Sequence, residues 1–425
     1  MHGHRGAYFP ETLVLFTLFF FKAHPFDLHF FCLHRMWKFG TWVGTNYGCP
    51  NHRKGVGFQK NSYQWPDCPY LRHYRTQGLE LASLMLEAYL HGDHRFGPTF
   101  AIDVMVPVIT EVLRYFYEHY EMNLQNEMVM RSQALETWQE CVNPTTDIAG
   151  LTWVTNKTLD LPFNVLPADS EARAMVTALL AQVPSMEKVI SEDSTGERFL
   201  DHCQWVTIEQ NNNVENVELY AVHPFPLYGN GFSEELPFIG NVTGGGEGAM
   251  RLINATYARR KFHNPISSAS SNGGPSIGEW QEGMQAARLG YADEAAENVQ
   301  LRASWGNVHL GPYSSDDDGK AEHVMRFPAF YGPLSSDGNA YPDLEHLASM
   351  RTTLQMQLLQ NDGNRILLFG GWPAGEDVSF KLHARQGTVV EASCSNGKIV
   401  SMNVVPQTRR KDIVIVGDAC VCDGC

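Results

Sequence analysis

The spacing of apolar residues changes once along the chain, from a helical period to a strand-like one. Between about residue 71 and residue 360, apolar side chains recur every three to four positions, which is typical of helices packed on one face. From residue 366 onward the apolar segments are short, rich in β-branched residues and separated by Gly, Asn or Asp. The pattern predicts a mainly α chain that ends in a small antiparallel β part.

Individual elements follow from the same pattern. Helices are expected over residues 71–90, 100–120, 148–159, 170–182, 250–260, 278–289, 292–301 and 343–360. Strands are expected over residues 366–369, 378–384, 388–393, 398–404 and 413–416. Residues 44–70 and 183–215 are predicted to be irregular, and prolines make 220–228 a loop rather than a strand. An apolar run over 13–21 is shorter than the ~20 residues that span a bilayer.

One polar stretch, residues 132–151, interrupts the helical pattern. Asn143 suits a helix N-cap and Pro144 suits the first helical position, so the stretch is predicted to be a polar loop that enters a helix N-terminus. Free backbone N–H groups at such an end can face a polar ligand. Trp138 lies among acids and amides there, a combination that suits a sugar site. The simpler interpretation is an acidic loop that caps the helix, with Trp138 in the core.

Composition excludes some classes of function. The 425 residues carry a net charge of −15, which disfavours nucleic acid and anionic membranes as partners but is neutral towards an uncharged carbohydrate. No P-loop, Gly-X-Ser-X-Gly or His-Glu-X-X-His motif occurs, so NTPase, serine hydrolase and zinc protease chemistry have no support. Among nine cysteines, only Cys420, Cys422 and Cys425 cluster, at a C-terminus expected to fray; they could bind a soft metal, although no fourth ligand lies nearby in sequence.

Six short motifs occur in an order that resembles proteins related to glycoside hydrolase family 95, the α-L-fucosidase-like family. The central one is Ala-Leu-Glu-Thr-Trp-Gln-Glu-Cys-Val-Asn-Pro-Thr-Thr-Asp-Ile-Ala-Gly-Leu, residues 134–151. The others lie at residues 6–12, 77–81, 220–229, 326–332 and 358–382. The resemblance covers most of the chain from Gly6 to about Val405 and implies an (α/α)6 toroid, the six-hairpin glycosidase-like fold, before the β part.

The resemblance also implies a set of site residues, with no metal and no cofactor. Glu136 matches the general acid of the family, and burial against Trp138 would keep it protonated. Glu345, with Asp343 as the alternative, matches the general base, although Leu347-Ala-Ser replaces the Gly-rich run of relatives. Acids in the first turn of a helix are also explained by its dipole. The residues expected to bind the substrate are Trp138, Gln139, Asn143, Asp147, His223, Trp280 and Arg326.

The domain organisation expected from these observations has three parts. Residues 1–362 form the toroid, with 17–38 as an insertion, residues 363–417 the β part, and residues 418–425 a Cys-rich tail. The resemblance implies that an upstream segment is missing, because the Asn pair that assists the base in relatives precedes the Gly6 motif. Three Asn-X-Ser/Thr sequons, at Asn156, Asn241 and Asn254, are compatible with a secreted or endomembrane glycoprotein, but they also arise by chance.

Three functions remain open at this level. The first is an inverting glycosidase that removes a terminal fucosyl- or galactosyl-type residue. Its two carboxyl groups would lie about 6.5–9.5 Å apart, so that a water molecule fits between them. The second is an inactive carbohydrate-binding homologue on the same scaffold. The third is a polysaccharide lyase, which would need Tyr, His and Arg as its acid–base set.

Overall fold

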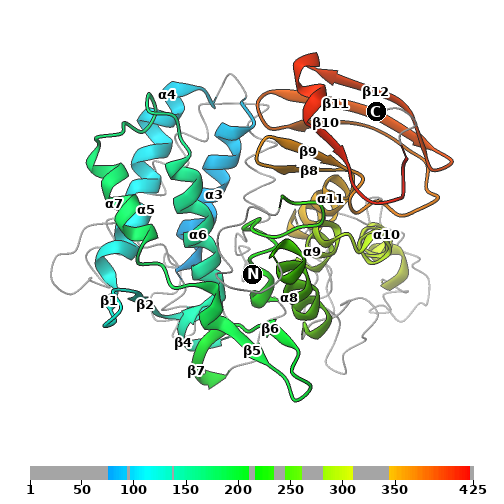
Figure 1. Ribbon diagram of the computed structural model, residues 1–425. Coiled ribbons are helices and arrows are strands. Elements are labelled where there is room, and N and C mark those ends of the chain that lie inside the picture. Colours follow the sequence, from blue (N-terminus) through cyan, green and yellow to red (C-terminus); the bar gives the residue numbers. More distant parts are fainter. Residues whose placement is uncertain are drawn as a thin grey trace, which may run out of the picture.

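A computed structural model of the chain describes residues 75–92, 96–135, 138–209, 216–233, 245–260, 281–309 and 344–421. About half of these residues are helical, and the strands form several small sheets. The predicted loop over 44–70 and the predicted insertion over 17–38 lie outside the described residues. The helices lie in two groups, with the C-terminal strands beside the second group (Figure 1).

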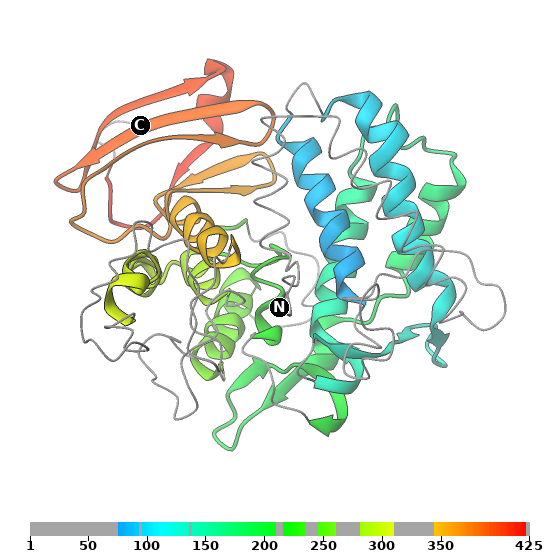
Figure 2. The same cartoon turned by 180° about the vertical axis from the view of Figure 1, so that it is seen from behind.

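The first helical group contains the helices predicted over 71–90, 100–120, 148–159 and 170–182, and its members pack on one another (Figures 1 and 2). Its helices are α3 (Thr76–Leu90), α4 (Pro98–Phe100), α5 (Val106–His119), α6 (Thr145–Leu159) and α7 (Glu171–Leu180). The predicted helix over 100–120 is interrupted by a π-helical turn, Ala101–Met105. Pro107 follows that turn and has no N–H to donate to residue 103, so the regular α-helical ladder cannot continue through it.

The second helical group is formed by α9, α10 and α11, which contact one another, and by α8. Their bounds are α8 (Gly245–Arg259), α9 (Glu282–Leu289), α10 (Ala292–His309) and α11 (Leu344–Leu358). The turn between α9 and α10 requires Gly290, whose φ of 83° lies in the left-handed region. Eight helices of eight residues or more therefore occur in the described ranges, without a complete ring, and the toroid remains a proposal.

The stretch predicted to be a polar loop is a β-hairpin, so that prediction is wrong. Strands β3 (Arg131–Ala134) and β4 (Trp138–Pro144) pair antiparallel, and β4 also pairs with β7 (Cys203–Glu209). The two left-handed residues Glu140 and Asn143, with φ of 53° each, break the alternation of side chains that marks a strand in sequence. Residues predicted to be irregular contain β7 as well as a second hairpin, β5 (Ile190–Glu192) with β6 (Arg198–Leu200).

The C-terminal β part confirms the predicted strands. Its strands are β8 (Leu359–Asp362), β9 (Arg365–Leu368), β10 (Val378–Ala384), β11 (Thr388–Ser395), β12 (Lys398–Val405) and β13 (Ile413–Ile415). One sheet has the order β10-β11-β12 and is antiparallel, while the other has the order β13-β9-β8. The pairing of β13 with β9 is parallel, which differs from the purely antiparallel arrangement expected.

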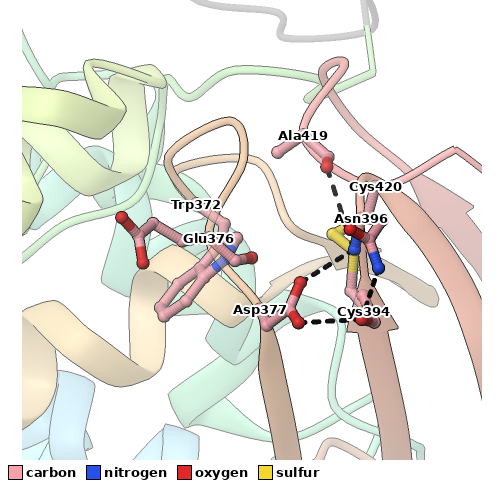
Figure 3. The surroundings of a disulfide bond; sticks show 8 residues. Trp372, Glu376, Asp377, Cys394, Asn396, Ala419 and Cys420 are labelled. Carbon is pink, nitrogen blue, oxygen red and sulfur yellow. Dashed lines mark hydrogen bonds between the residues drawn. A yellow bond between two sulfur atoms is a disulfide. The ribbon is translucent and has the colours of Figure 1, made fainter.

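A separate hydrophobic cluster fills the β part and includes Ile366, Val390 and Val404. Cys420 also belongs to it, fully buried and bonded to Cys394, so the chain does not fray at this cysteine as the sequence suggested (Figure 3). Cys422 and Cys425 lie outside the described residues. The disulfide joins the end of the chain to β11 and thereby completes the cluster.

The β part is fastened to the first helical group by an ion pair. The Nε and Nη2 groups of Arg385 both donate to the carboxylate of Glu87 on α3, and the Nε–Oε2 distance is 3.1 Å. Beside this pair, the backbone N–H of Gln386 donates to the carbonyl oxygen of Leu90 at 2.7 Å. Burial alone would raise the pKa of Glu87, but the charge and hydrogen bonds of Arg385 outweigh it and hold the pKa below its usual value.

Two of the three sequons lie in the described helices. Asn156 is on α6, where its side-chain amide donates to the carbonyl oxygen of Thr152, and its partner Thr158 is buried. Asn254 is on α8, and its partner Thr256 is buried and bonded to Leu200. Folded chain therefore offers neither site to a glycosylating enzyme. Among the helices of the described ranges, none has the length and apolarity to cross a bilayer.

Replacing Arg385 by Met should lower the free energy of unfolding by about 2 kcal/mol at pH 7, because Glu87 loses a charged, partly buried partner. Since the folded-state pKa of Glu87 is lowered, the pair stabilises the fold above the ordinary pKa of 4.5 and loses its effect as the pH falls through the folded-state value. Urea denaturation at pH 7 and pH 3 would measure this. Lys381→Met, which removes an exposed pair with Glu391, is the control and should cost less than about 0.5 kcal/mol.

Removing the disulfide with the double substitution Cys394→Ala and Cys420→Ala should lower the free energy of unfolding by about 3–4 kcal/mol, because the bridge closes a loop with a sequence separation of 26. Denaturation of the natural chain with and without a thiol reductant should show a similar loss. The double variant should not respond to the reductant, and equal stability of both chains would contradict the pairing.

Candidate functional site

The side chains of the three predicted catalytic residues, Glu136, Glu345 and Asp343, are not described by the structure. Four of the predicted residues lie outside the described ranges: Glu136, which falls between β3 and β4 in the sequence, Trp280, Arg326 and Asp343. Gln139 and Glu345 lie within β4 and α11, but their side chains are not described. Trp138, Asn143, Asp147 and His223 remain; Asn143 directly precedes the N-cap residue of α6, and Asp147 lies in the first turn of that helix.

Asn143 does not cap α6, so the predicted helix start is shifted. It lies in β4, where its Oδ1 accepts from the backbone N–H of Met130 and its Nδ2 donates to Oε1 of Gln204, at 2.8 and 2.7 Å. Pro144 is the residue at the N-cap, and α6 begins at Thr145. Asn143 therefore connects β4 to its neighbours on both sides, and its amide is fully used inside the protein.

Asp147 lies in the first turn of α6 and is completely buried. Burial raises its pKa to about 6, against the opposing effect of the Thr76 and Ser132 hydroxyl groups and the charge of Arg75. The hydroxyl group of Thr76 donates to Oδ1 of Asp147 at 2.6 Å. A carboxyl group with this pKa exchanges its proton within the neutral range, although its position separates it from solvent.

Trp138 is stacked on His202. The ring centroids are 3.7 Å apart and the planes are inclined by 14°, and Trp138 is only 8% exposed. One face of the indole is thus covered by imidazole rather than open to a sugar. The Nδ1 of His202 lies 2.5 Å from Oδ1 of Asp201. Burial alone would raise the pKa of Asp201, but its hydrogen bond and ion pair with His202 lower it.

The Asp201–His202 segment is fixed to the start of α6. The backbone N–H of Thr145 donates to the carbonyl oxygen of His202 at 3.0 Å, and its hydroxyl group donates to that of Asp201 at 2.5 Å. These bonds satisfy donors at a helix N-terminus that would otherwise lack partners. They bring the Trp138–His202 stack next to the helix end that carries Asp147.

Glu218 is a second carboxyl group with a raised pKa in this region. It lies in a 3-10 turn, Val217–Leu219, that contacts α6 and α8. Burial raises its pKa to about 7; the nearby His202 and Arg260 lower the pKa and Asp201 raises it, but burial dominates. As a whole residue Glu218 is only partly buried, in contrast to Asp147. A carboxylic acid near pH 7 is suited to general acid catalysis.

His223, one of the expected substrate-binding residues, is buried. The His223–Pro224 peptide bond is cis, and the imidazole is 9% exposed among the buried residues of 220–228. Burial, with a smaller effect of Arg288, lowers its pKa to about 3. It is therefore neutral at physiological pH and cannot supply a proton there.

The region cannot use a cysteine nucleophile. Cys141 on β4 and Cys203 on β7 are both buried free thiols. A hydrogen bond with Cys141, followed by burial, raises the pKa of the Cys203 thiol. The reactive thiolate is thus disfavoured. Within the described ranges, no three His, Cys, Asp or Glu side chains lie close enough together to hold a metal ion.

Sequence reasoning missed Asp201, His202 and Glu218. The adjacent acid and imidazole in Asp-His-Cys were visible, but residues 183–215 showed no period that would place them on an element. Their role depends on contacts with α6, some 55 residues earlier in the chain, as the separation of 56 between Thr145 and Asp201 shows. The cluster formed by Trp138, Asp201, His202 and Glu218, beside the N-terminal end of α6, is hereafter the α6 site.

Asp147→Asn should make the stability less dependent on pH. Because the folded-state pKa of Asp147 is raised to about 6, the natural chain loses stability as the pH rises from about 4 to 6. The variant lacks this loss, so its unfolding free energy should gain about 2–3 kcal/mol relative to the natural chain between pH 4 and pH 7. Urea denaturation at the two pH values would measure the change. A constant difference would show that Asp147 does not hold a proton.

Comparisons with known proteins add distant similarity in structure. No protein-family profile matches the chain, and no curated protein matches it in sequence. Among solved structures, a chain from the human microbiome assigned as a kojibiose phosphorylase aligns with a TM-score of 0.43 and 9% identity. The alignment covers 77% of this chain and 46% of that chain, so this chain spans less than half of that protein. Similarity at this level establishes neither the reaction nor the substrate.

Proposed function

We propose that the protein is a carbohydrate-active enzyme, an inverting glycosidase that removes a terminal fucosyl- or galactosyl-type residue. The observation that carries the proposal is the meeting of two features at the N-terminal end of α6. One is the β3–β4 hairpin, which contains the motif with the family 95 resemblance. The other is Glu218, a carboxyl group with a pKa of about 7 that lies near His202 and Asp201.

The reaction needs one carboxylic acid and one carboxylate. The acid protonates the leaving oxygen while the carboxylate activates water on the opposite face of the sugar ring. We assign the acid to Glu136, in the connection that follows β3, with Glu218 as the second candidate because it holds a proton near pH 7. The base is assigned to Glu345 or Asp343, which flank Leu344 at the start of α11. Gln139, Trp280, His223 and Arg326 stay proposed substrate contacts, and no cofactor or metal is required.

The proposed domain division is the toroid over 1–362, the β part over 363–417 and the tail over 418–425. The separate hydrophobic cluster of the β part supports a division near residue 362, and it also takes in Leu358 and Leu359 before that point and Cys420 from the tail. The Cys394–Cys420 disulfide is typical of proteins in oxidising compartments and supports a secreted or endomembrane location.

Glu136→Gln should reduce kcat for release of the terminal sugar from unactivated fucosyl and galactosyl oligosaccharides by about 10²-fold or more, because the alkoxide leaving group loses its proton donor; nitrophenyl glycosides, whose leaving group needs little protonation, should be affected less. Glu140→Gln, an exposed acid four residues along in the same hairpin, is the matched control and should keep full activity. Proton NMR of the released sugar should show inversion at the anomeric carbon.

Glu218→Gln tests the second candidate in the same assay. If Glu218 is the acid, the variant rather than Glu136→Gln loses activity, and the falling limb of the natural pH profile should lie near pH 7. Turnover that is unchanged in both variants would contradict the assignment of the site.

A non-catalytic carbohydrate-binding protein is the second candidate function. It is favoured by Leu347-Ala-Ser, which replaces the Gly-rich run that follows the general base in relatives. Saccharide binding in a glycan array without release of sugar would support this function over the first, while turnover would exclude it.

A further inference from the structure

A pocket outside the α6 site lies between the α9–α10 turn and the β part, with a volume of about 470 Å³. Tyr291, Asp293 and Glu294 line it from the turn and the start of α10, and Trp372 and Asp418 line it from loops of the β part. The volume falls within the range of about 300–1,000 Å³ typical of small-molecule sites. The sugar chemistry proposed for the α6 site uses none of these residues.

The pocket has an excess of negative charge. Asp293, Glu294 and Asp418 contribute three carboxylates, and no Lys, Arg or His belongs to the lining. Asp293 and Asp418 are exposed and have no cationic partner in the part of the chain that the structure describes. The N-terminus of α10 adds the equivalent of only about half a positive charge, which falls short of one carboxylate.

Arg260 does not remove this excess. Its Nη2 donates to Oε2 of Glu294 at 2.9 Å, but its Nε and Nη2 also donate to Oε1 of the buried Glu282 at 3.0 and 2.7 Å. One guanidinium group therefore serves two carboxylates, and Glu294 does not have it alone. A cation that entered the pocket would gain attraction that a neutral ligand would not.

Aromatic rings with fixed orientations form two of the walls. The indole N–H of Trp372 donates to the carbonyl oxygen of Glu376 at 2.9 Å, and Figure 3 shows these residues next to the disulfide. Tyr291 is stacked on Tyr257, with ring centroids 4.5 Å apart and planes inclined by 10°. The disulfide at Cys420 fixes the wall that contains Asp418. Aromatic faces attract organic cations, most strongly when carboxylates lie nearby.

A bare metal ion does not fit the arrangement, because the described residues contain no group of three carboxylate, imidazole or thiolate side chains close enough to share one. We propose that this pocket binds an organic ammonium group, held by Asp293 and Asp418 and packed against Trp372 and Tyr291. The proposal does not depend on the sugar chemistry, so the two can fail separately.

The direct test compares choline with 3,3-dimethyl-1-butanol, which has the same shape without the charge, by isothermal titration calorimetry and ligand-observed NMR. Choline should bind at least about tenfold more tightly than the alcohol, and its affinity should fall as salt is raised. Equal affinity for the two probes, or no binding of choline at about 50 mM, would overturn the proposal.

Variants locate the binding. Asp418→Asn and Trp372→Leu should each weaken choline binding about threefold to tenfold. Asp169→Asn, an exposed acid before α7, is the control and should bind choline normally, as should Glu136→Gln. Asp418→Asn keeps the shape of the side chain, and an unchanged melting temperature would show that the variant is folded. Choline binding unaffected by both pocket variants would overturn the assignment of the site.

Discussion

The burial of Asp147 at the first turn of α6 constrains everything around it. A carboxyl group without access to water is costly to ionise, so the surrounding elements must supply hydrogen bonds or the group must keep its proton. Here both occur, because the hydroxyl group of Thr76 reaches from α3 and the pKa is still raised to about 6. The contact between α3 and α6 is therefore made by a polar group as well as by apolar side chains.

The same end of α6 organises the sheet beneath it. Asn143 does not cap the helix. Instead, the backbone N–H of Thr145 donates to the carbonyl oxygen of His202, and its hydroxyl group donates to the carbonyl oxygen of Asp201. This pairing fixes the residue pair that precedes β7, which in turn brings His202 onto the ring of Trp138. A local requirement, the free donors of a helix N-terminus, thus assembles side chains from distant parts of the chain into one cluster.

The C-terminal strands were predictable, and the hairpin before α6 was not. Val378–Ala384 has the predicted bounds because its apolar and polar residues alternate along a regular strand between turns. In β4, the left-handed conformations of Glu140 and Asn143 destroy that alternation, so the same reasoning gave a loop. At His223, the following Pro224 restricts the backbone to extended conformations and does not determine whether the side chain is buried. Packing of the surrounding residues decided its burial.

The candidate site was predictable in part, for a similar reason. Composition drew attention to Trp138 and Asp147, because acids and an aromatic residue were concentrated in one short stretch, and their contact with a substrate stays a prediction. It could not identify Glu218, since one glutamate in an unremarkable segment gains its raised pKa only from the residues that fold over it. Arg260 illustrates how far such effects extend. It lowers the pKa of Glu218, and it also bonds to Glu282 and to Glu294, which lines the proposed ammonium pocket. The positive charge of Arg260 therefore acts on both the α6 site and the ammonium pocket, a connection that only the folded structure reveals.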